Sequence, residues 1–253
     1  GVIGGTGAGK TRGYAMPNLL QANCSYAVTD PKGELLRSCG SFLERQGYRV
    51  VVLDLIHMDQ SHCYNPFEYL ENENDVQRLV TNFFRATGNK NGVSGDNQFW
   101  EDTAQMYLMA MIFLLLEQAP PEEQNFASVR ELVTRDMVQD GDDMGMGAAE
   151  PSPLAALFYQ IERERPDSID LKYYKACHTS AGKTMKSIQI SLLAHLNKFN
   201  LKAVADLTRV DELHLERMGE EKTALFCVIP DNDTSFNFLV SILYTQLFQM
   251  LFR

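Results

Sequence analysis

The first eleven residues combine glycines, a lysine and a threonine in an arrangement suited to holding phosphate groups. Residues 4–11 read GGTGAGKT and fit the pattern G-x-x-x-x-G-K-[ST]. Glycines lack a Cβ, so the backbone can turn back on itself and aim successive N–H groups at a phosphate. Lys10 would place its charge between the β- and γ-phosphates, and the Thr11 hydroxyl would ligate Mg²⁺. The predicted ligands are therefore ATP and Mg²⁺.

The residues around this loop supply the setting that such a loop requires. Val2-Ile3 read as the end of a buried strand, and Thr11–Met16 can begin a helix. The alternative is a glycine-rich turn with a stray lysine. Because the strand must be buried in a sheet, we expect the numbering to begin inside a longer protein. We assign nucleotide binding to Gly4, Gly5, Thr6, Gly7, Ala8, Gly9, Lys10, Thr11 and Arg12.

A second group of chemically active side chains follows the next short apolar run. Residues 25–30 read as a buried strand that ends on Asp30, and Pro31 stops the ladder. Lys32-Gly33-Glu34 follow at the strand tip. Asp30 and Glu34 are candidate catalytic carboxylates, although a specific catalytic set is not defined by the sequence. The alternative interpretation is a turn followed by a helix N-cap.

The elements that position these residues alternate between strand and helix. Leu35–Gln46 fits an amphipathic helix, and Arg49–Leu55 and Thr223–Ile229 fit buried strands rich in β-branched residues. This alternation predicts an α/β fold with an open, mostly parallel sheet and helices on both faces. Ligands in such folds bind at the carboxyl ends of the strands. Asp30 and Glu34 would therefore lie on the same edge as the phosphate loop.

The middle of the chain has a different character, with helix patterns and no convincing strand from about Asn74 to Asn200. We predict an all-α domain inserted into an incomplete nucleotide-binding sheet. The expected domains are 1–73 for the first part of the sheet, 74–204 for the insertion and 205–253 for the second part. The expected helices cover 75–86, 97–118, 126–139, 153–165, 169–178 and 179–199.

Composition places the chain among ordinary globular proteins. It has 253 residues and a net charge of -10, with 45% hydrophobic and 22% charged residues. The acidic balance argues against a surface that binds nucleic acid throughout. The five cysteines are widely spaced, which indicates reduced thiols. The longest apolar run, 106–116, is shorter than the ~20 residues needed to span a bilayer.

Several motifs together resemble the coupling-protein ATPases of conjugation and type IV secretion. This is the TraG/TraD class, within the FtsK–HerA group of DNA motors, and the matches extend from the first residue to about Phe238. The DPKGE and IPDND blocks are much more specific than the phosphate loop. The matching blocks are GGTGAGKT at 4–11, PNLL at 17–20, DPKGE at 30–34, YNPF at 64–67, FWE at 99–101 and IPDND at 229–233.

The resemblance implies a RecA-like nucleotide-binding domain with an inserted all-α domain, and an N-terminal transmembrane anchor expected outside this sequence. It also implies hexameric rings on the cytoplasmic face of the bacterial cell membrane, with ATP between subunits. Such proteins recruit relaxase–DNA complexes or effector proteins and pass them to a secretion channel. The all-α domain is associated with recognising the substrate. The implied partners are therefore a relaxase or another secreted protein, DNA and the type IV secretion channel.

The sequence departs from that family in one motif. The family's second acidic motif, an apolar strand ending in Asp-Glu, is expected beyond Arg253, because Asp54 ends an apolar run but is followed by Leu55. Hydrolysis would then lack the Asp that holds Mg²⁺ and the Glu that activates water. We expect ATPase activity in an intact parent and little in this chain. Two alternatives remain, a protein-docking module without turnover and a P-loop small-molecule kinase.

Charge suggests which partner the insertion binds. Between Asp96 and Glu164 there are fourteen acidic residues and three arginines. Such a surface would repel a phosphate backbone and attract a basic protein segment. A solubility role for these acids is the alternative. We predict that this face binds a protein.

Overall fold

The computed structural model describes residues 9–88, 95–139, 152–181 and 184–252. The chain folds into two compact units, one formed by Gly1–Tyr64 with Asp211–Arg253 and the other by Asn65–Val210. We call these the sheet unit and the helical unit. The sequence placed the insertion at 74–204, whereas the helical unit of the structure begins at Asn65.

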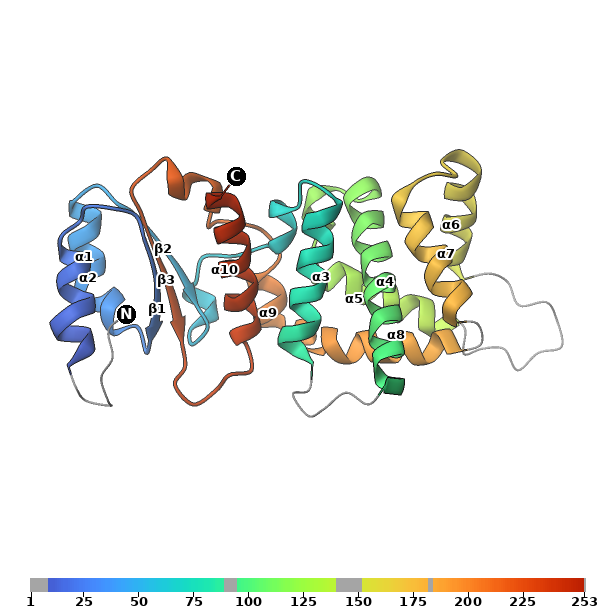
Figure 1. The fold of residues 1–253 in the computed structure, drawn as a ribbon, viewed down its shortest axis with the longest axis horizontal. Helices are drawn as coiled ribbons and strands as arrows, with labels where there is room; N and C mark the ends of the chain where they lie inside the picture. Colours follow the sequence, from blue (N-terminus) through green and yellow to red (C-terminus); the bar gives the residue numbers. More distant parts are fainter. Residues whose placement is uncertain (1–8, 89–94, 140–151, 182–183, 253) are drawn as a thin grey trace. The chain divides into compact units, whose positions relative to one another are not determined.

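The sheet unit contains three parallel strands in the order β1-β3-β2 (Figure 1). The strands are β1 (Tyr26–Pro31), β2 (Arg49–Asp54) and β3 (Thr223–Ile229). β3 is buried along nearly its whole length because it is hydrogen-bonded to a neighbour on each side, whereas β1 mostly alternates between partly buried and exposed residues. The parallel α/β fold is therefore confirmed, and the order shows that the strand after the insertion lies between the two that precede it.

Helices cover both faces of this sheet. The first helix runs through a π turn, η1 (Thr11–Ala15), into α1 (Met16–Leu20), and packs with α2 (Glu34–Arg45) on one face (Figure 1). The core on this face joins Leu19, Cys39 and Leu43 to the strand residue Phe226. On the other face, α10 (Asn237–Leu251) places Tyr244 against β1, where its hydroxyl lies 2.8 Å from the Thr29 hydroxyl. Two short 3-10 segments, η2 (Met58–Gln60) and η7 (Leu215–Gly219), complete the unit.

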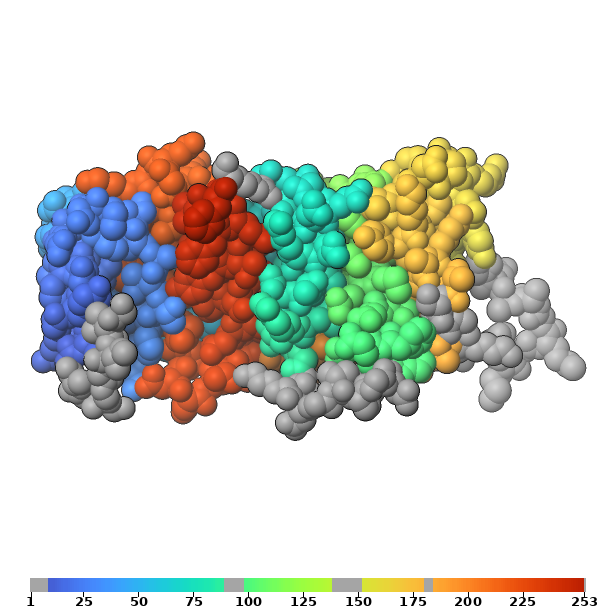
Figure 2. Space-filling view, in the orientation of Figure 1, coloured from blue at the N-terminus to red at the C-terminus, as the bar shows by residue number. Residues whose placement is uncertain are grey.

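The helical unit contains no strand within its described residues. Its helices are α3 (Glu73–Thr87), α4 (Gly95–Gln118), α5 (Phe126–Gln139), α6 (Pro153–Glu164), α7 (Ile169–Ala181), α8 (Met185–Leu196) and α9 (Lys202–Leu207), with 3-10 segments η3 (Pro66–Tyr69), η4 (Pro121–Glu123) and η6 (Asn197–Asn200). α4 is its central helix, in contact with α3, α5, α7 and α8. The surfaces of α3, α4 and α7 lie side by side in the space-filling view (Figure 2).

Two details of the helical unit differ from the sequence expectation. The break between the fifth and sixth predicted helices was placed after His178, but α7 continues to Ala181 and α8 starts at Met185. The segment 202–207 was not predicted to be helical and forms α9. Within the described residues, no helix combines the length and the apolar character needed to cross a bilayer.

His195 links the pH of the solution to the stability of the helical unit. Its ring packs 4.4 Å from the ring of Phe84, and its Nδ1 lies 2.7 Å from the Thr87 hydroxyl. Burial lowers the pKa of His195 below its usual 6.5. The folded chain therefore holds this ring neutral at pH values where the unfolded chain protonates it, and stability is lost as the pH falls through about 6.5.

We expect the thermal midpoint of the chain to fall more steeply between pH 7.5 and pH 5.5 in the wild type than in His195→Gln. Glutamine can bond to the Thr87 hydroxyl but does not titrate. The measurement is thermal unfolding followed by circular dichroism at a series of pH values. Parallel curves for the two proteins would show that His195 does not contribute to the pH dependence.

Candidate nucleotide-binding site

The described part of the predicted phosphate loop is the start of the first helix. Gly9 adopts a left-handed conformation with φ of 74°, and its carbonyl accepts the first helical bond from the Gly13 N–H at 2.7 Å. No atom lies within 4 Å of a Cβ built at Gly9, so its backbone angle, rather than crowding, favours glycine here. Lys10 is exposed and already helical. The predicted residues Gly4 to Ala8 lie outside the described part of the chain.

The first helix runs so that its start faces the carboxyl edge of the sheet. At its other end, the Tyr26 hydroxyl donates a 3.0 Å hydrogen bond to the Asn18 carbonyl. Tyr26 is the first residue of β1, so the end of the helix lies beside the beginning of that strand. The start of the helix, with Lys10 and Thr11, therefore points toward the end of β1. Positive helix N-termini at this edge are where α/β folds hold phosphate groups.

Asp30 sits at the end of β1 with only 1% of its surface exposed. One carboxylate oxygen accepts the Leu35 N–H at 3.1 Å and the other accepts the Leu36 N–H at 2.8 Å. These two amides belong to the first turn of α2, whose preceding residue, Gly33, has no side chain to cap it. The geometry therefore favours the capping interpretation of Asp30. Glu34, the other carboxylate proposed from sequence, is exposed at the first position of α2.

A tight turn joins β1 to α2. The Gly33 N–H donates to the Asp30 carbonyl at 3.1 Å, with Pro31 and Lys32 between them. Proline suits the second position of such a turn, and a positive φ is required at the third. Lys32 occupies that third position with φ of 65°, which is unusual for a residue other than glycine, asparagine or aspartate. The turn therefore holds Lys32 in a disfavoured conformation at the edge of the sheet.

Lys32 pairs with the block that follows β3. Its Nζ lies 2.5 Å from a carboxylate oxygen of Asp231, and both side chains are largely exposed. The hydrogen bond to Asp231, and then its charge, raise the pKa of Lys32. This pair joins the DPKGE and IPDND blocks. The sequence contains both blocks, and an acid two residues after a buried strand was the signal for Asp231.

The end of β2 lies at the same edge. Asp54 and Asp30 are both in register with Val228 of β3, one from each side. Asp54 does not stand free, because one of its carboxylate oxygens accepts the N–H groups of Ile56 at 2.7 Å and His57 at 2.9 Å. Its carboxylate thus forms the turn that ends the strand, as Asp residues commonly do.

The arrangement fits a nucleotide with Mg²⁺ at its described positions. The left-handed Gly9, the lysine at the helix start and the threonine hydroxyl after it are the donor types such a ligand needs. Lys10 and Thr11 would contact the phosphates and the cation.

Two comparisons relate the chain to known proteins. The sequence model of the family described as "Type IV secretory system Conjugative DNA transfer" matches residues 1–253. The chain belongs to this conjugative DNA transfer family. Among solved structures, it is similar to a bacterial conjugative coupling protein, TrwBdeltaN70 in an unbound monoclinic form, with a TM-score of 0.53 and 18% sequence identity. A comparison with curated proteins finds no match.

At 18% sequence identity, the similarity to that solved structure concerns the fold of this chain. The match covers 97% of this chain and 49% of the coupling protein, so the chain spans about half the length of that structure. The predicted resemblance to coupling proteins is confirmed. The RecA-like character of the sheet unit is consistent with the same match.

Replacing Asp30 with asparagine tests the capping role of its carboxylate. An asparagine side chain at this position would keep one acceptor but turn an amide N–H₂ toward one of the two helix N–H groups. We expect Asp30→Asn to lower the free energy of unfolding by about 1–2 kcal/mol, measured by urea denaturation. Glu34→Gln is the control, because Glu34 is exposed and only the interaction with the helix dipole is lost. Equal stability of Asp30→Asn and the wild type would argue against a capping role.

Proposed function

We propose that this chain is the ATP-binding part of a conjugative or type IV secretion coupling protein. It would recruit a relaxase–DNA complex or an effector protein and drive its transfer with ATP. The observation that carries the proposal is the helix that starts at the left-handed Gly9 with Lys10 and Thr11, at the carboxyl edge of a parallel sheet, in a member of the conjugative DNA transfer family.

Each residue of the predicted site takes a specific part in this proposal. The backbone of residues 4–9 and the charge of Lys10 bind the phosphates, with Arg12 close by on the exposed surface of the helix. Thr11 ligates Mg²⁺, which supplies charge neutralisation at the transferred phosphate when bound. Asp30 holds α2 in place, and Glu34 and Asp231 present carboxylates at the same edge.

Assembly and location follow from the family as further parts of the proposal. We place the parent protein at the cytoplasmic face of the bacterial membrane as a hexamer, with DNA and the type IV secretion channel as partners. The kinase alternative predicts an arginine-rich lid over the phosphates, and the loop expected at residues 140–153 contains no arginine. No described feature favours that alternative.

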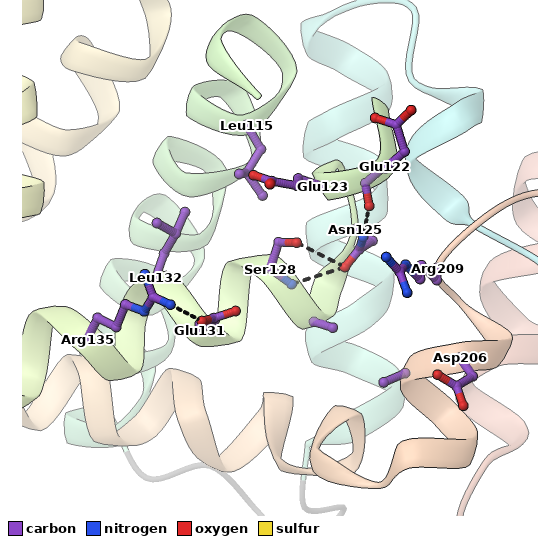
Figure 3. A pocket seen from close by; sticks show the side chains of 12 residues that line it. Leu115, Glu122, Glu123, Asn125, Ser128, Glu131, Leu132, Arg135, Asp206 and Arg209 are labelled. Carbon is purple, nitrogen blue, oxygen red and sulfur yellow. Dashed lines mark hydrogen bonds and ion pairs between the residues drawn. The ribbon is translucent and has the colours of Figure 1, made fainter. Parts of the chain in front are cut away.

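The helical unit supports a docking role through an acidic cleft. A cavity of about 440 Å³ lies between η4, α5 and α9 (Figure 3). Glu122 and Glu123 of η4, Glu131 of α5 and Asp206 of α9 line it, together with two arginines. Arg135 is bound to Glu131, and Asp206 is bound to Lys202. Four acids thus line the cleft against two arginines, Arg135 and Arg209. Glu122 and Glu123 present exposed carboxylates there, and the excess of acids suits a basic segment of a protein rather than a phosphate backbone.

Lys10→Ala should remove nucleotide binding from the full-length parent while leaving its fold intact, because Lys10 is exposed. We expect a loss of affinity of about tenfold or more, measured by equilibrium binding of a fluorescent ATP analogue with Mg²⁺. Lys186→Ala, another exposed lysine on α8, is the matched control and should leave affinity unchanged. Retained binding in Lys10→Ala would count against the site.

A double substitution tests the acidic cleft. We expect Glu122→Gln with Glu123→Gln to weaken binding to the relaxase of the same transfer system, and the effect to shrink as salt is raised. Glu220→Gln with Glu221→Gln removes the same charge from two adjacent exposed residues of the sheet unit and should have little effect. Binding can be measured by surface plasmon resonance on the full chain. Tight, salt-sensitive binding of single-stranded DNA with no relaxase binding would contradict the docking role.

A further inference from the structure

The helical unit contains an apolar cavity beside the acidic cleft. It has a volume of about 500 Å³ and lies between α5 and α6, which contact each other. Leu132 of α5 and Pro153, Leu154 and Leu157 of α6 supply its apolar lining. Leu132 and Leu157 are half-buried and Pro153 is exposed, so these three side chains keep surface that a ligand can reach. We call this space the leucine cavity.

The residue spacing on α6 explains why Leu157 is left partly open. Leu154, Phe158 and Ile161 are buried and recur at the spacing of one helix face, so they pack into the core of the unit. Leu157 lies beside that face, one helical turn after Pro153. A single exposed leucine needs no explanation, but open apolar side chains from two helices around one cavity form a surface that gains free energy when it is covered.

The charged residues that border the leucine cavity are engaged elsewhere. Asp136 is buried, and its carboxylate accepts hydrogen bonds from the Tyr107 hydroxyl and the Gln189 amide. Arg135 is bound to Glu131, which lines the acidic cleft. Among the described residues that line it, the leucine cavity therefore offers mainly apolar contact.

Two residues of α5 join the leucine cavity to the acidic cleft. Leu132 and Arg135 line both spaces, and Figure 3 shows them beside Glu131 in the cleft. They are three positions apart, so the two spaces meet within one turn of the helix. An arginine can border both, because its stem is apolar and its head is charged. The two spaces thus form one groove that is apolar at one end and acidic at the other.

We propose that this groove binds a protein segment in which a large apolar side chain is followed or preceded by basic residues. The inference rests on the proposed docking role of the helical unit and names the chemistry of the docked segment. The apolar side chain enters the leucine cavity, and the basic residues face Glu122, Glu123 and Asp206 of the acidic cleft. An extended chain advances about 3.3 Å per residue, so about three to five residues can lead from one space to the other.

Other occupants match only one end of the groove. A small apolar molecule would fill the leucine cavity and leave the acidic cleft without a partner. Single-stranded DNA would bring phosphates to the acids. A second copy of this chain would bring a net charge of -10 to the same acids. A protein segment that is both apolar and basic matches both ends, in shape and in the sign of its charge.

The test uses the full chain and three peptides, with binding measured by calorimetry and located by NMR. The probe is acetyl-Gly-Phe-Gly-Gly-Arg-Gly-Lys-Gly-amide. The serine peptide replaces its Phe with Ser, and the glutamine peptide replaces both its Arg and its Lys with Gln. We expect the probe to bind saturably and to shift the methyl signals of Leu132 and Leu157.

The two altered peptides separate the apolar contact from the charged one. The serine peptide should bind about fivefold more weakly than the probe, because it cannot bury an apolar ring. That loss should persist as salt is raised, since ions do not screen apolar contact. The glutamine peptide should also bind more weakly, and its loss should shrink with salt.

A variant of the cavity provides a second, independent comparison. Leu157→Gln should weaken the probe about fivefold and leave the affinity for the serine peptide unchanged, because the Phe of the probe and Leu157 act through the same contact. Leu193→Gln is the matched control, because it makes the same change at a half-buried leucine of α8 that lines neither space. Its affinity for the probe should stay within about twofold of wild type.

Pro153→Ala guards against misfolding of Leu157→Gln, which is detected by circular dichroism. Alanine is a good helix former, and removal of the exposed ring should weaken the probe about threefold. Equal binding of the probe and the serine peptide, or unchanged probe affinity in Pro153→Ala and a folded Leu157→Gln, would overturn the proposal. So would self-association of the chain that Leu157→Gln abolishes, or displacement of the probe by a thymidine oligonucleotide.

The relaxase distinguishes failure of this inference from failure of the proposed function. If Glu122→Gln with Glu123→Gln weakens relaxase binding but Leu157→Gln does not, docking stands and the leucine cavity is wrong. If the relaxase does not bind the wild type while the three peptides behave as expected, the groove stands and docking of the relaxase fails. Weaker relaxase binding in Leu157→Gln than in Leu193→Gln supports the inference.

Discussion

The two parallel ladders of β3 are the interaction on which the sheet unit depends. β3 pairs with β1 from Tyr26 to Pro31 on one side and with β2 from Arg49 to Asp54 on the other. Neither outer strand pairs with the other, so the sheet cannot form until the chain has passed through the helical unit and returned. Pairing of this kind has a high loop-closure cost, which must be offset by burial of the central strand. The complete burial of Ala224, Leu225, Phe226 and Cys227 meets that need.

The return of the chain is fixed close to the point where it left the sheet unit. The Glu212 N–H donates to the Cys63 carbonyl at 2.9 Å, and the Glu212 carboxylate accepts the Cys63 N–H at 2.7 Å. Both residues belong to the sheet unit. The helical unit can therefore be inserted without disturbing the ladders, provided that it has a core of its own. It has one, in which the rings of Phe83, Phe126 and Phe199 contact one another.

Local patterns predicted the elements well because their signals are contained within short windows. The β-branched run at 49–54 and the amphipathic spacing at 34–45 encode a strand and a helix directly. α9 escaped prediction because its six residues are too few to establish a helical period. The strand order and the pair between Lys32 and Asp231 depend on contacts between residues about two hundred positions apart, which a single sequence does not reveal.

The roles of the candidate site residues likewise depend on contacts that a single sequence does not reveal. From its position after a strand, Asp30 could be a catalytic acid or a cap, and only its hydrogen bonds to Leu35 and Leu36 favour one interpretation. The leucine cavity was not predicted, because Leu132 and Leu157 lie on two helices and each sits in an ordinary helical pattern. Sequence spacing can predict a site when one loop carries it, as it does for residues 4–11, and gives no signal when packing assembles the site.

Charge at the carboxyl edge of the sheet bears on how the proposed site would hold phosphates. The edge carries Asp30, Asp54 and Asp231, with the exposed Glu34 beside them, and these acids on their own would repel a nucleotide. Two of them are bound by backbone N–H groups, Asp30 at the start of α2 and Asp54 in the turn after β2, and Asp231 is paired with Lys32. The positive charge of Lys32 is thus largely neutralised by Asp231. The attraction for an anion then comes from the start of the helix and from Lys10. A phosphate-binding loop provides this arrangement.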